Sequence, residues 1–543
     1  WLERNPSGCA FLDHHHALVL GGSVDFEVEM SMNYLQGQHI LILGLGASGL
    51  AMARWCAFAG AEVTVADTRD APANLEILKT ELPSVHWISG PFTAGLVEAT
   101  SVRAVFASPG LAPADTAPVL DAAKNMGLWT GGELSLFVQA LEQLKATRDY
   151  VPKVLAITGT NGKTTVTALT GQLIERAGKT VKVAGNIGPT LLGTLQASLD
   201  ELPEVWVLEL SSFQLDNAGP FEPAAATVLN VTQDHLDWHG SMEAYAAAKE
   251  KIFGQQTLML LNRDDARVMA MLPDPVRAKL QKPVVREHIT YGASMPERPG
   301  DFGLETVNGM TWLVRALESD ETRRLRKGEV EEIHIQRLMP ADALRIRGRH
   351  NAVNALAALA LASSTGCSLA AMLFGLREYK GEPHRVESVA IVNDIEYFDD
   401  SKGTNVGATV AALVGLGSER RVVVILGGDG KGQDFSPLAE PVARYTRAVV
   451  LIGRDAPIIR EELKLCGVPL IDAHTLPEAV HAAKDIAQSG DAVLLSPACA
   501  SFDMFRDYPH RAQVFCQTVV EIAEAAGQVM ESCLLYTSPS PRD

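Results

Sequence analysis

Cysteine is scarce in this sequence, which has seven cysteines in 543 residues and no CxxC pair. Neither a disulfide framework nor a zinc site fits an odd number of scattered cysteines. Basic residues are also few, 47 against 65 acidic ones, and the formal charge of -18 disfavours binding to phosphate backbones. No apolar run reaches the roughly 18 residues that span a bilayer. We therefore predict a protein of the reducing cytoplasm that binds no nucleic acid and does not insert into membranes.

The two ends differ from the rest of the chain. Residues 1–31 have no clear periodicity, and we predict a non-native or unstructured extension there, with Met32 as the start. Residues 533–543, CLLYTSPSPRD, follow an abrupt break from a helical pattern, and we interpret them as an adapter-derived tail. The length between these ends exceeds what one hydrophobic core supports.

Three α/β domains are predicted from the alternation of apolar strands with helical segments. Residues 32–131 form a Rossmann-like domain, with strands HILILG, EVTVAD and RAVFASPG. Residues 132–381 form a central P-loop ATPase-type domain with a parallel sheet, in which the charge-dense stretch 287–345 forms peripheral hairpins. Residues 382–532 form a C-terminal Rossmann-like α/β domain, with strands RVVVILGG, AVVLIG and AVLLSPA.

The first strand leads into the glycine turn GLGASG, Gly44–Gly49. Such a turn lets a pyrophosphate approach backbone N–H groups at a helix N-terminus. Asp67 falls near the position of the ribose-binding acid in dinucleotide-binding folds. NAD and a UDP-sugar both carry a pyrophosphate, so the turn alone does not separate the two ligands.

A second phosphate-binding pattern begins at the strand KVLAIT, Lys153–Thr158, which leads into GTNGKTT and a helix. The loop directs backbone N–H groups at a phosphate, Lys163 adds positive charge, and the Thr164 hydroxyl can bind magnesium. The spacing departs from the usual P-loop, because Ile157 stands where that motif has its first glycine. An ordinary tight turn before a helix is the alternative interpretation.

Polar side chains follow two further strands of the central domain. Glu209 lies near the end of VWVLEL, and His235 lies in NVTQDHLDWHG after the next strand. Open α/β sheets bind ligands at the carboxyl ends of their strands, and oxygen ligands suit magnesium. Taken singly, Glu209 is typical of a solvated strand end, the Asp/His loop of a polar turn, and Lys249 of a solvated helix lysine.

Nine motifs occur in order along the chain: GTNGKTT, GNIG, LELSSFQL, LNVTQDHLD, GRHNAVNALAA, EPHRVE, DDSKGTN, LGGDGKGQDF and LLSPACASFDMF. On these motifs the chain, over about residues 32–532, resembles the ATP-dependent Mur ligases of peptidoglycan synthesis. The resemblance implies that ATP phosphorylates a substrate carboxylate and that an amino acid attacks the acyl phosphate. It further implies a monomeric enzyme that adds D-glutamate to UDP-N-acetylmuramoyl-L-alanine and releases ADP and phosphate.

The resemblance also implies a nucleotide site and a metal site. Asn351 and Asn354 would face the adenine, Arg385 the phosphates and Asp400 the ribose, although helix caps and surface charges explain each one singly. His350 and Lys402 lie in the same motifs without an assigned role. The ATP-binding residues are Gly159, Thr160, Asn161, Gly162, Lys163, Thr164, Thr165, Asn351, Asn354, Arg385 and Asp400.

Thr164 and Glu209 would bind one magnesium, and His235, Glu209 and Lys249 would hold a second metal. The catalytic set would be Lys163, Glu209, His235 and Lys249. Lys249 is carbamylated in this family, which turns a cation into a carboxylate-like oxygen ligand. Spacing in the sequence does not reveal that modification.

Two further residue sets follow from the resemblance. A member of the family has Phe at the position of Tyr508, so this chain keeps the ring and adds a hydroxyl there. Cys499 is expected to be a packing residue. Asn186 and Ser211 match positions near the substrate carboxylate, although local turn hydrogen bonds explain them equally well. The UDP-substrate set is Ala47, Ser48, Asp67, Thr68, Arg69, Gly110, Asn186 and Ser211, and the D-glutamate set is Thr404, Lys431, Ser501 and Tyr508.

Four alternatives stay open. The L-alanine-adding ligase of the family is the nearest, although ACASFDMF and DDSKGTN favour D-glutamate, and the absence of a DNPR motif argues against a diamino acid. A folate polyglutamylating ligase would lack the N-terminal UDP-binding domain. An NAD-dependent oxidoreductase and a non-enzymatic P-loop switch represent other functional classes.

Overall fold

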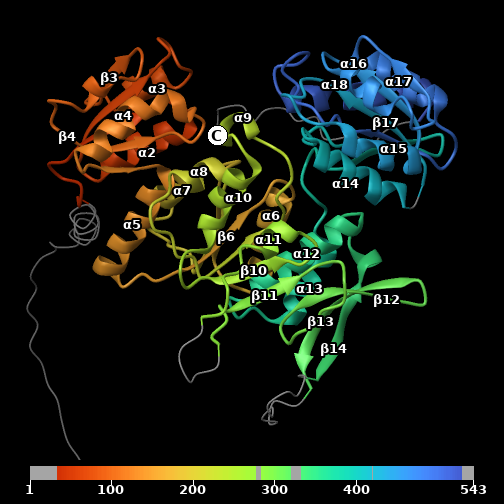
Figure 1. The fold of residues 1–543 in the computed structure, drawn as a ribbon, viewed down its shortest axis with the longest axis horizontal. Helices are drawn as coiled ribbons and strands as arrows, with labels where there is room; N and C mark the ends of the chain where they lie inside the picture. The colour runs from red at the N-terminus through yellow and green to blue at the C-terminus, as the bar shows by residue number, and fades with distance from the viewer. Residues whose placement is uncertain (1–32, 277–282, 320–331, 419, 529–543) are drawn as a thin grey trace, which may run out of the picture. The chain divides into compact units, whose positions relative to one another are not determined.

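The computed structural model describes residues 33–276, 283–319, 332–418 and 420–528 (Figure 1). The predictions for residues 1–31 and 533–543 lie outside these ranges. The described residues up to Thr130, with Gln139–Tyr150, form one compact unit, and Gly131–Val138 with the described residues from Val151 onward form a second. The domain boundaries remain predictions. Among the described residues, none of the helices combines the length and the apolar character needed to cross a membrane.

A five-stranded sheet of order β3-β2-β1-β4-β5 is built first along the chain. The pairs β1–β2, β1–β4 and β2–β3 are parallel, as predicted. Strand β1 is buried from Ile40 onward, as expected of a parallel strand covered on both faces. The elements are β1 (His39–Leu43), α2 (Ala47–Phe58), β2 (Glu62–Asp67), α3 (Leu75–Glu81), β3 (His86–Ser89), β4 (Val102–Ala107), α4 (Pro113–Asn125), β5 (Trp129–Gly131) and α5 (Glu133–Arg148).

The central sheet has six strands in the order β11-β10-β9-β6-β8-β7, and all its neighbours are parallel. Its carboxyl ends therefore share one edge. The strands are β6 (Lys153–Thr158), β7 (Val181–Gly185), β8 (Val205–Glu209), β9 (Ala225–Val228), β10 (Leu258–Asn262) and β11 (His288–Tyr291). The helices are α6 (Lys163–Arg176), α7 (Leu191–Ala197), α8 (Ser212–Asp216), α9 (Leu236–His239), α10 (Met242–Glu250), α11 (Ala266–Met269), α12 (Arg349–Ser363) and α13 (Leu369–Glu378).

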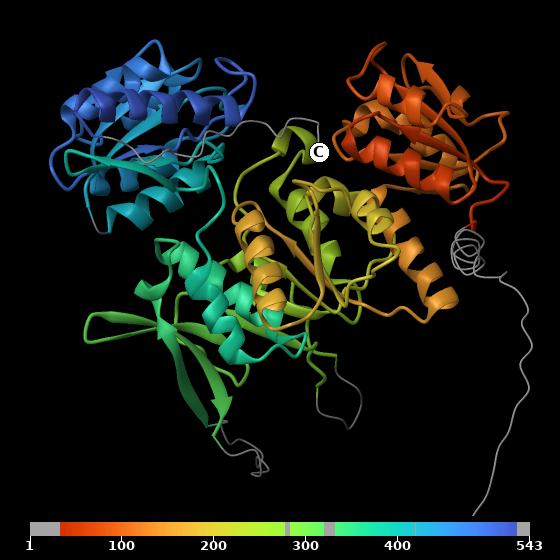
Figure 2. The same ribbon diagram turned by 180° about the vertical axis from the view of Figure 1, so that it is seen from behind.

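The charge-dense stretch 287–345 forms hairpins only in part. Strands β12 (Phe302–Val307), β13 (Met310–Glu318) and β14 (Ile333–Pro340) make the predicted antiparallel hairpins (Figure 2). The prediction was wrong for β11, which adds in parallel to the edge of the central sheet beside β10. Its two buried residues, Thr290 and Tyr291, gain a covered face there that a peripheral hairpin would not provide.

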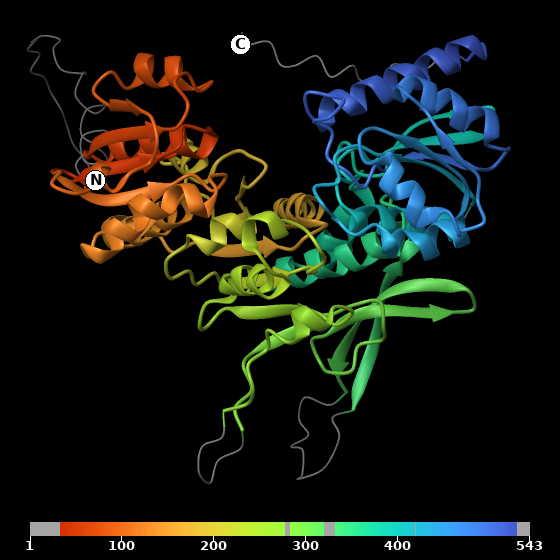
Figure 3. The same ribbon diagram turned by 45° about the horizontal axis from the view of Figure 1, so that its top comes forward.

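The C-terminal sheet is mixed, in the order β15-β16-β20-β17-β18-β19, because β15 runs antiparallel to β16 while the other pairs are parallel. Alternate residues of β17 enter two apolar cores, one packed by α17 and α18 and the other by α14, α15 and α16. Figure 3 shows helices on both sides of this sheet, in blue and teal. The elements are β15 (Glu387–Val392), β16 (Ile395–Asp399), α14 (Val406–Gly417), β17 (Val422–Gly427), α15 (Ala439–Tyr445), β18 (Thr446–Ile452), α16 (Ala456–Leu463), β19 (Leu470–Asp472), α17 (Leu476–Ile486), β20 (Ala492–Leu495) and α18 (Tyr508–Ala525).

Candidate active site

The strand, loop and helix predicted around GTNGKTT are present, since β6 ends at Thr158 and α6 begins at Lys163. Gly159 and Gly162 have φ values of 153° and 83°, which glycine adopts without a Cβ clash. The Asn230 side chain accepts from the Asn161 N–H at 2.8 Å and donates to the Asn161 carbonyl at 3.0 Å. The loop is thus preorganised at a helix N-terminus, where an anion binds favourably.

Lys163 lies inside this loop. Its Nζ donates to the carbonyls of Gly159 and Thr160, both at 2.9 Å. Burial lowers the pKa of Lys163, and the nearby charge of Glu209 acts in the opposite direction. A buried ammonium held by neutral carbonyls is well suited to exchange them for charged phosphate oxygens.

Two cations from the turns that flank β15 and β16 reach the same helix end. The Thr164 hydroxyl accepts from Arg385 at 3.0 Å and from Lys402 at 3.5 Å. Burial lowers the pKa of Lys402 to about 8, with the Arg385 charge acting in the same direction. This concentration of positive charge fits a ligand with several negative charges. Sequence reasoning named Lys402 without a role, and the structure places it beside the P-loop helix.

Glu209 lies where the sequence predicted, at the end of β8, and is 4% exposed. It pairs with Ile157 of β6, so it shares the sheet edge with the P-loop. Asn186 donates its backbone N–H to the Glu209 carbonyl at 2.8 Å and its side-chain amide to the Glu209 carboxylate at 3.2 Å. The Ser211 hydroxyl accepts from the Gln214 N–H at 3.2 Å in a capping box, which starts α8.

His235 precedes α9 in a left-handed conformation, with φ of 52°. Its ring lies edge-on to Phe213, with centroids 4.8 Å apart, and its Nε2 is 3.6 Å from the Asp234 carboxylate. Burial lowers the pKa of His235 although Asp234 opposes the shift. The imidazole is therefore held neutral, which is the form that ligates metals.

Lys249 is buried, only 1% exposed, so its interpretation as a solvated helix lysine was wrong. Its Nζ donates to the Gly159 carbonyl at 3.0 Å and lies 4.5 Å from the centroid of the Tyr245 ring. Within the ranges that the structure describes, no carboxylate forms an ion pair with it. Burial lowers the pKa of Lys249 well below 10.5, and the charge of Lys163 adds to the effect.

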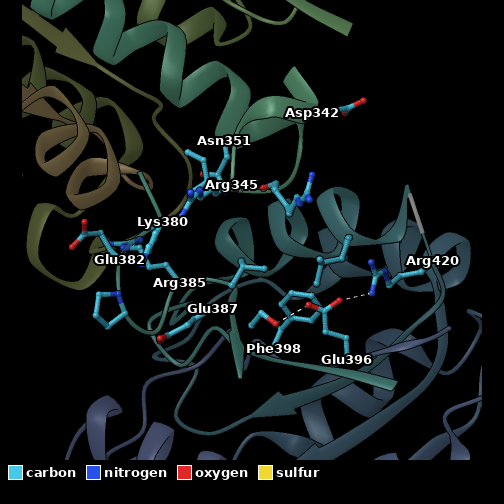
Figure 4. A pocket seen from close by; sticks show the side chains of 17 residues that line it. Asp342, Arg345, Asn351, Lys380, Glu382, Arg385, Glu387, Glu396, Phe398 and Arg420 are labelled. Carbon is cyan, nitrogen blue, oxygen red and sulfur yellow. Dashed lines mark hydrogen bonds and ion pairs between the residues drawn. The ribbon is translucent and has the colours of Figure 1, made fainter. Parts of the chain in front are cut away.

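A pocket of about 780 Å³ is lined by the first turn of α12 and by the segment that joins the central and C-terminal sheets (Figure 4). Asn351 and Arg385, both predicted to bind ATP, line it. Asn351 accepts from the Asn354 amide at 3.2 Å. A Cβ on Gly162 would come within 2.9 Å of Asn354 Oδ1, so Asn354 lies directly against the P-loop. The pocket is large enough for a nucleoside.

Asp400 follows β16 and is 6% exposed. It accepts from the Ser496 hydroxyl at 2.6 Å and from the Val386 N–H at 3.3 Å. Burial raises the pKa of Asp400 to about 7, because the opposing effects of Ser496 and Arg385 are smaller. The folded protein therefore holds a proton on Asp400 more tightly than the unfolded chain does.

We expect Asp400→Asn to stabilise the protein at alkaline pH. As the pH rises from 3.8 towards 7, Asp400 ionises in the unfolded chain while the folded protein keeps its proton, so the free energy of unfolding falls. An amide does not ionise, so the variant escapes this loss. Urea unfolding should find the variant's advantage larger by roughly 2 kcal/mol at about pH 8.5 than at about pH 5. Asp485→Asn is the control for the loss of one carboxylate, since Asp485 is exposed and forms its ion pair with the neighbouring Lys484. An advantage of Asp400→Asn that does not change with pH would contradict the argument.

The residues predicted for D-glutamate lie on loops that are joined to one another. Asp429 and Ala500 exchange backbone hydrogen bonds of 3.0 and 2.8 Å, which joins the loops after β17 and β20. Ala498 donates to the Gly403 carbonyl at 3.0 Å, which joins the loop after β16 to them. These loops and the start of α18 carry Thr404, Lys431, Ser501 and Tyr508.

Tyr508 lies beside a buried ion pair. Its ring centroid is 5.7 Å from Lys402 Nζ and 6.1 Å from the centroid of the His384 ring. His384 Nδ1 is 2.6 Å from the Asp399 carboxylate. Burial lowers the pKa of His384, but the Asp399 hydrogen bond and charge outweigh it and raise the pKa above 6.5. Tyr508 thus lies beside the cation Lys402 and beside a histidine that is paired with a carboxylate.

The N-terminal unit contains the glycine turn. The Ser108 hydroxyl donates to the Gly44 carbonyl at 2.9 Å, and the Asp67 carboxylate accepts from the Leu45 N–H at 2.7 Å. Arg69 donates three further hydrogen bonds to Asp67, one from its backbone N–H at 2.9 Å and two from its guanidinium at 2.8 and 2.7 Å. Burial would raise the pKa of Asp67, but these bonds lower it to about 2. Asp67 thus joins the turn to Arg69, and the exposed or half-buried residues nearby are Ala47, Ser48, Thr68, Arg69 and Gly110.

Sequence reasoning missed two side chains that support these loops. Tyr245 lies one helical turn before Lys249, and this spacing was the available signal. Arg511 is 1% exposed and donates to the carbonyls of Ser401, at 2.7 Å, and Cys499, at 3.1 Å. No motif marks Arg511, because its partners are backbone groups. Cys499 itself is buried in an apolar core, as expected.

Comparisons with known proteins agree along the length of the chain. Three family models match in order: the Mur ligase MurD-like N-terminal domain at residues 38–131, the Mur ligase middle domain at 157–362, and the Mur ligase glutamate ligase domain at 384–499. A MurF ligase structure from Thermotoga maritima in complex with ADP has a TM-score of 0.51 at 15% identity, and the match covers 91% of this chain and 96% of that one. At this identity the match shows only that the two chains share a fold.

Two relatives have much higher identity. The UDP-N-acetylmuramoylalanine--D-glutamate ligase of Albidiferax ferrireducens is 68% identical over 502 residues, which cover 92% of this chain and 99% of that protein. The protein of the same name from Polaromonas sp. is 59% identical over 92% of this chain and 100% of that protein. The chain therefore belongs to the Mur ligase family, whose members use ATP.

Proposed function

We propose that this chain joins D-glutamate to UDP-N-acetylmuramoyl-L-alanine in peptidoglycan precursor synthesis and converts ATP to ADP and phosphate. The observation that carries the proposal is the 68% identity to the D-glutamate ligase of A. ferrireducens across 99% of that protein. The meeting of Lys163, Arg385 and Lys402 at the start of α6 supports it. Phosphoryl transfer depends on such charge neutralisation.

ATP would bind with its phosphates on the P-loop and its adenosine in the pocket beside Asn351. Lys163 would leave the loop carbonyls for the β- and γ-phosphates, and the backbone N–H groups of the loop would bind the remaining phosphate oxygens. Arg385 and Lys402 reach this helix end from the C-terminal sheet, so they would neutralise the charge that develops during transfer. Asp400 would bind the ribose.

The donor set at the sheet edge fits magnesium. Thr164 and Glu209 offer oxygens beside the P-loop, and His235 offers a neutral imidazole. Bound there, magnesium would supply Lewis-acid neutralisation of the phosphate oxygens.

Lys249 fits carbamylation. It is buried, it has no carboxylate in an ion pair among the described residues, and its lowered pKa favours the neutral amine. That amine would attack the carbon of CO₂ and form a carbamate, with release of one proton. The product would carry an oxygen ligand towards the metal site, where the unmodified ammonium would repel the metal and Lys163.

The bond changes follow from these positions. The substrate carboxylate would attack the γ-phosphorus, ADP would leave, and the uncharged amine of D-glutamate would attack the acyl carbon. Phosphate would then leave, and the amine would lose a proton to solvent. Lys431 would pair with a carboxylate of D-glutamate while Thr404, Ser501 and Tyr508 donate hydrogen bonds to it.

Amino-acid choice is tested by phosphate release. With UDP-N-acetylmuramoyl-L-alanine, ATP and magnesium, we expect D-glutamate to give turnover at least roughly 100-fold above L-alanine, glycine or meso-diaminopimelate. A site that binds both carboxylates of D-glutamate has polar groups that stay unpaired when another amino acid is bound. Turnover with L-alanine and UDP-N-acetylmuramate would instead support the nearest alternative. Turnover with D-glutamate no higher than with the other amino acids would contradict the proposal.

A further inference from the structure

Asn405 occupies a junction between three loops of the site. It is 5% exposed and caps α14, since its Oδ1 accepts from the Ala408 N–H at 2.9 Å. It directly follows Thr404, one of the residues proposed to bind D-glutamate. The next residue, Val406, donates its N–H to Gln433 at 3.0 Å, which ties the same helix start to the loop of Lys431.

The Asn405 amide also crosses to the central domain. Its Nδ2 donates to Asn161 Oδ1 at 3.1 Å, and its Oδ1 accepts from Asn161 Nδ2 at 3.3 Å. The same Nδ2 donates to the Asp234 carboxylate at 3.4 Å, next to His235. Both donors and both acceptor positions of this buried amide are therefore used, which is the full capacity of an asparagine side chain.

Packing within the same first turn of α14 gives an independent indication of this contact. A Cβ on Gly407 would lie 2.9 Å from Thr232 Oγ1 and 3.2 Å from Asn161 Nδ2. Gly407 therefore lets the start of α14 approach the P-loop more closely than any larger residue would. Asn161 is in turn held by Asn230 through two hydrogen bonds, so the junction is attached to a braced loop.

We propose that Asn405 is a positioning residue that couples the P-loop to the amino-acid site. By tying the start of α14 to Asn161 and Asp234, it sets the position of Thr404 relative to the phosphates of ATP. The inference rests on the proposed function for its kinetic consequence. Its structural consequence, that nucleotide binding orders the start of α14, does not depend on which amino acid is used.

Asn405→Ser separates capping from coupling, because serine also caps helices but is too short to reach Asn161. We expect thermal unfolding close to that of the unsubstituted chain, together with a fall of roughly tenfold in kcat/KM for D-glutamate, the size expected for a lost buried hydrogen-bond pair. The KM for UDP-N-acetylmuramoyl-L-alanine should not change. Unchanged kcat/KM for D-glutamate would overturn the proposal.

A double-mutant cycle with Asn161→Ala distinguishes coupling from a purely structural role. If the two side chains act through their contact, the double variant should lose little more than the worse single variant. If the fold-losses in kcat/KM of the two single variants multiply in the double variant, the two side chains act independently and the inference is overturned. Gly407→Val provides a second route should Asn405→Ser fail to fold, since it leaves the cap intact and separates the same surfaces. It should lower kcat/KM for D-glutamate in the same way, and an unchanged value would count against the proposal.

Amide hydrogen exchange tests the coupling without turnover. Adding ATP and magnesium to the unsubstituted chain should protect amides at both the P-loop and the start of α14. In Asn405→Ser the P-loop protection should remain and the α14 protection should be lost. Coupled protection in a chain that does not use D-glutamate would refute the proposed function alone, whereas D-glutamate turnover without coupled protection would refute the coupling alone.

Discussion

Replacing Lys249 by alanine should abolish ligation, with a fall in kcat of about a thousandfold or more. The buried Lys249 side chain has no ion-pair partner among the described carboxylates, and in our proposal its neutral amine becomes the carbamate ligand of magnesium. Loss of that oxygen ligand removes charge neutralisation at the reacting phosphate. Phosphate release with saturating D-glutamate and ATP measures the effect, and acetate or a similar small carboxylate should restore part of the activity.

Lys251→Ala is the matched control, since Lys251 lies two residues further along, is 47% exposed and pairs with Asp216. Its removal should change kcat little, because exposed ion pairs contribute about 0–1 kcal/mol. Intact-protein mass spectrometry under native conditions should find the mass of one CO₂ on the unsubstituted chain and none on Lys249→Ala. Full activity of Lys249→Ala would rule out the metal-ligand role.

Lys163→Ala should have an effect of similar size. Lys163 is the cation closest to the loop backbone, where its Nζ contacts the carbonyls of Gly159 and Thr160. In our proposal Lys163 binds the β- and γ-phosphates, so its removal would take a buried charge away from them, and we expect kcat/KM for ATP to fall by roughly a thousandfold. Lys163→Arg should recover only part of this loss, because a planar guanidinium does not replace a compact ammonium at a point contact.

Lys182→Ala serves as the control for Lys163. Lys182 is exposed on β7, and its replacement should leave ATP use unchanged. Titration of the Lys163→Ala variant with ATP then separates binding from chemistry. A variant that recovers full kcat at high ATP would have lost only binding, and the proposed role in transition-state neutralisation would be wrong.

The P-loop could be predicted from sequence because its signal is contiguous. A buried strand, two glycines, a lysine and a helix start occur within one short segment, and the structure forms β6, the loop and α6 from it. Glu209 could be placed beside the loop because parallel strands end at a common edge. The roles of these residues stay predictions, whereas their positions are now described.

Other features could not be predicted, because they depend on residues far apart in the chain. Lys249 is buried against Thr158 and Gly159, which precede it by 91 and 90 residues. The helical pattern around Lys249 does not reveal contacts with such distant residues, so the sequence alone favoured a solvated side chain. The same reason applies to β11, since the residues of this short strand do not by themselves indicate that it pairs with β10.

By itself, the sequence determined three α/β domains, a phosphate-binding loop, and a resemblance strong enough to name an enzyme family and a substrate. Only the tertiary structure decided that Arg385 and Lys402 meet at Thr164, 221 and 238 residues away, and that Asn405 meets Asn161 across 244 residues. The physical reason is the separation along the chain of the residues that interact. Strands, turns and helix starts are set by neighbouring residues, whereas the charge, burial and hydrogen bonds of a site are set by whichever segments the fold brings together.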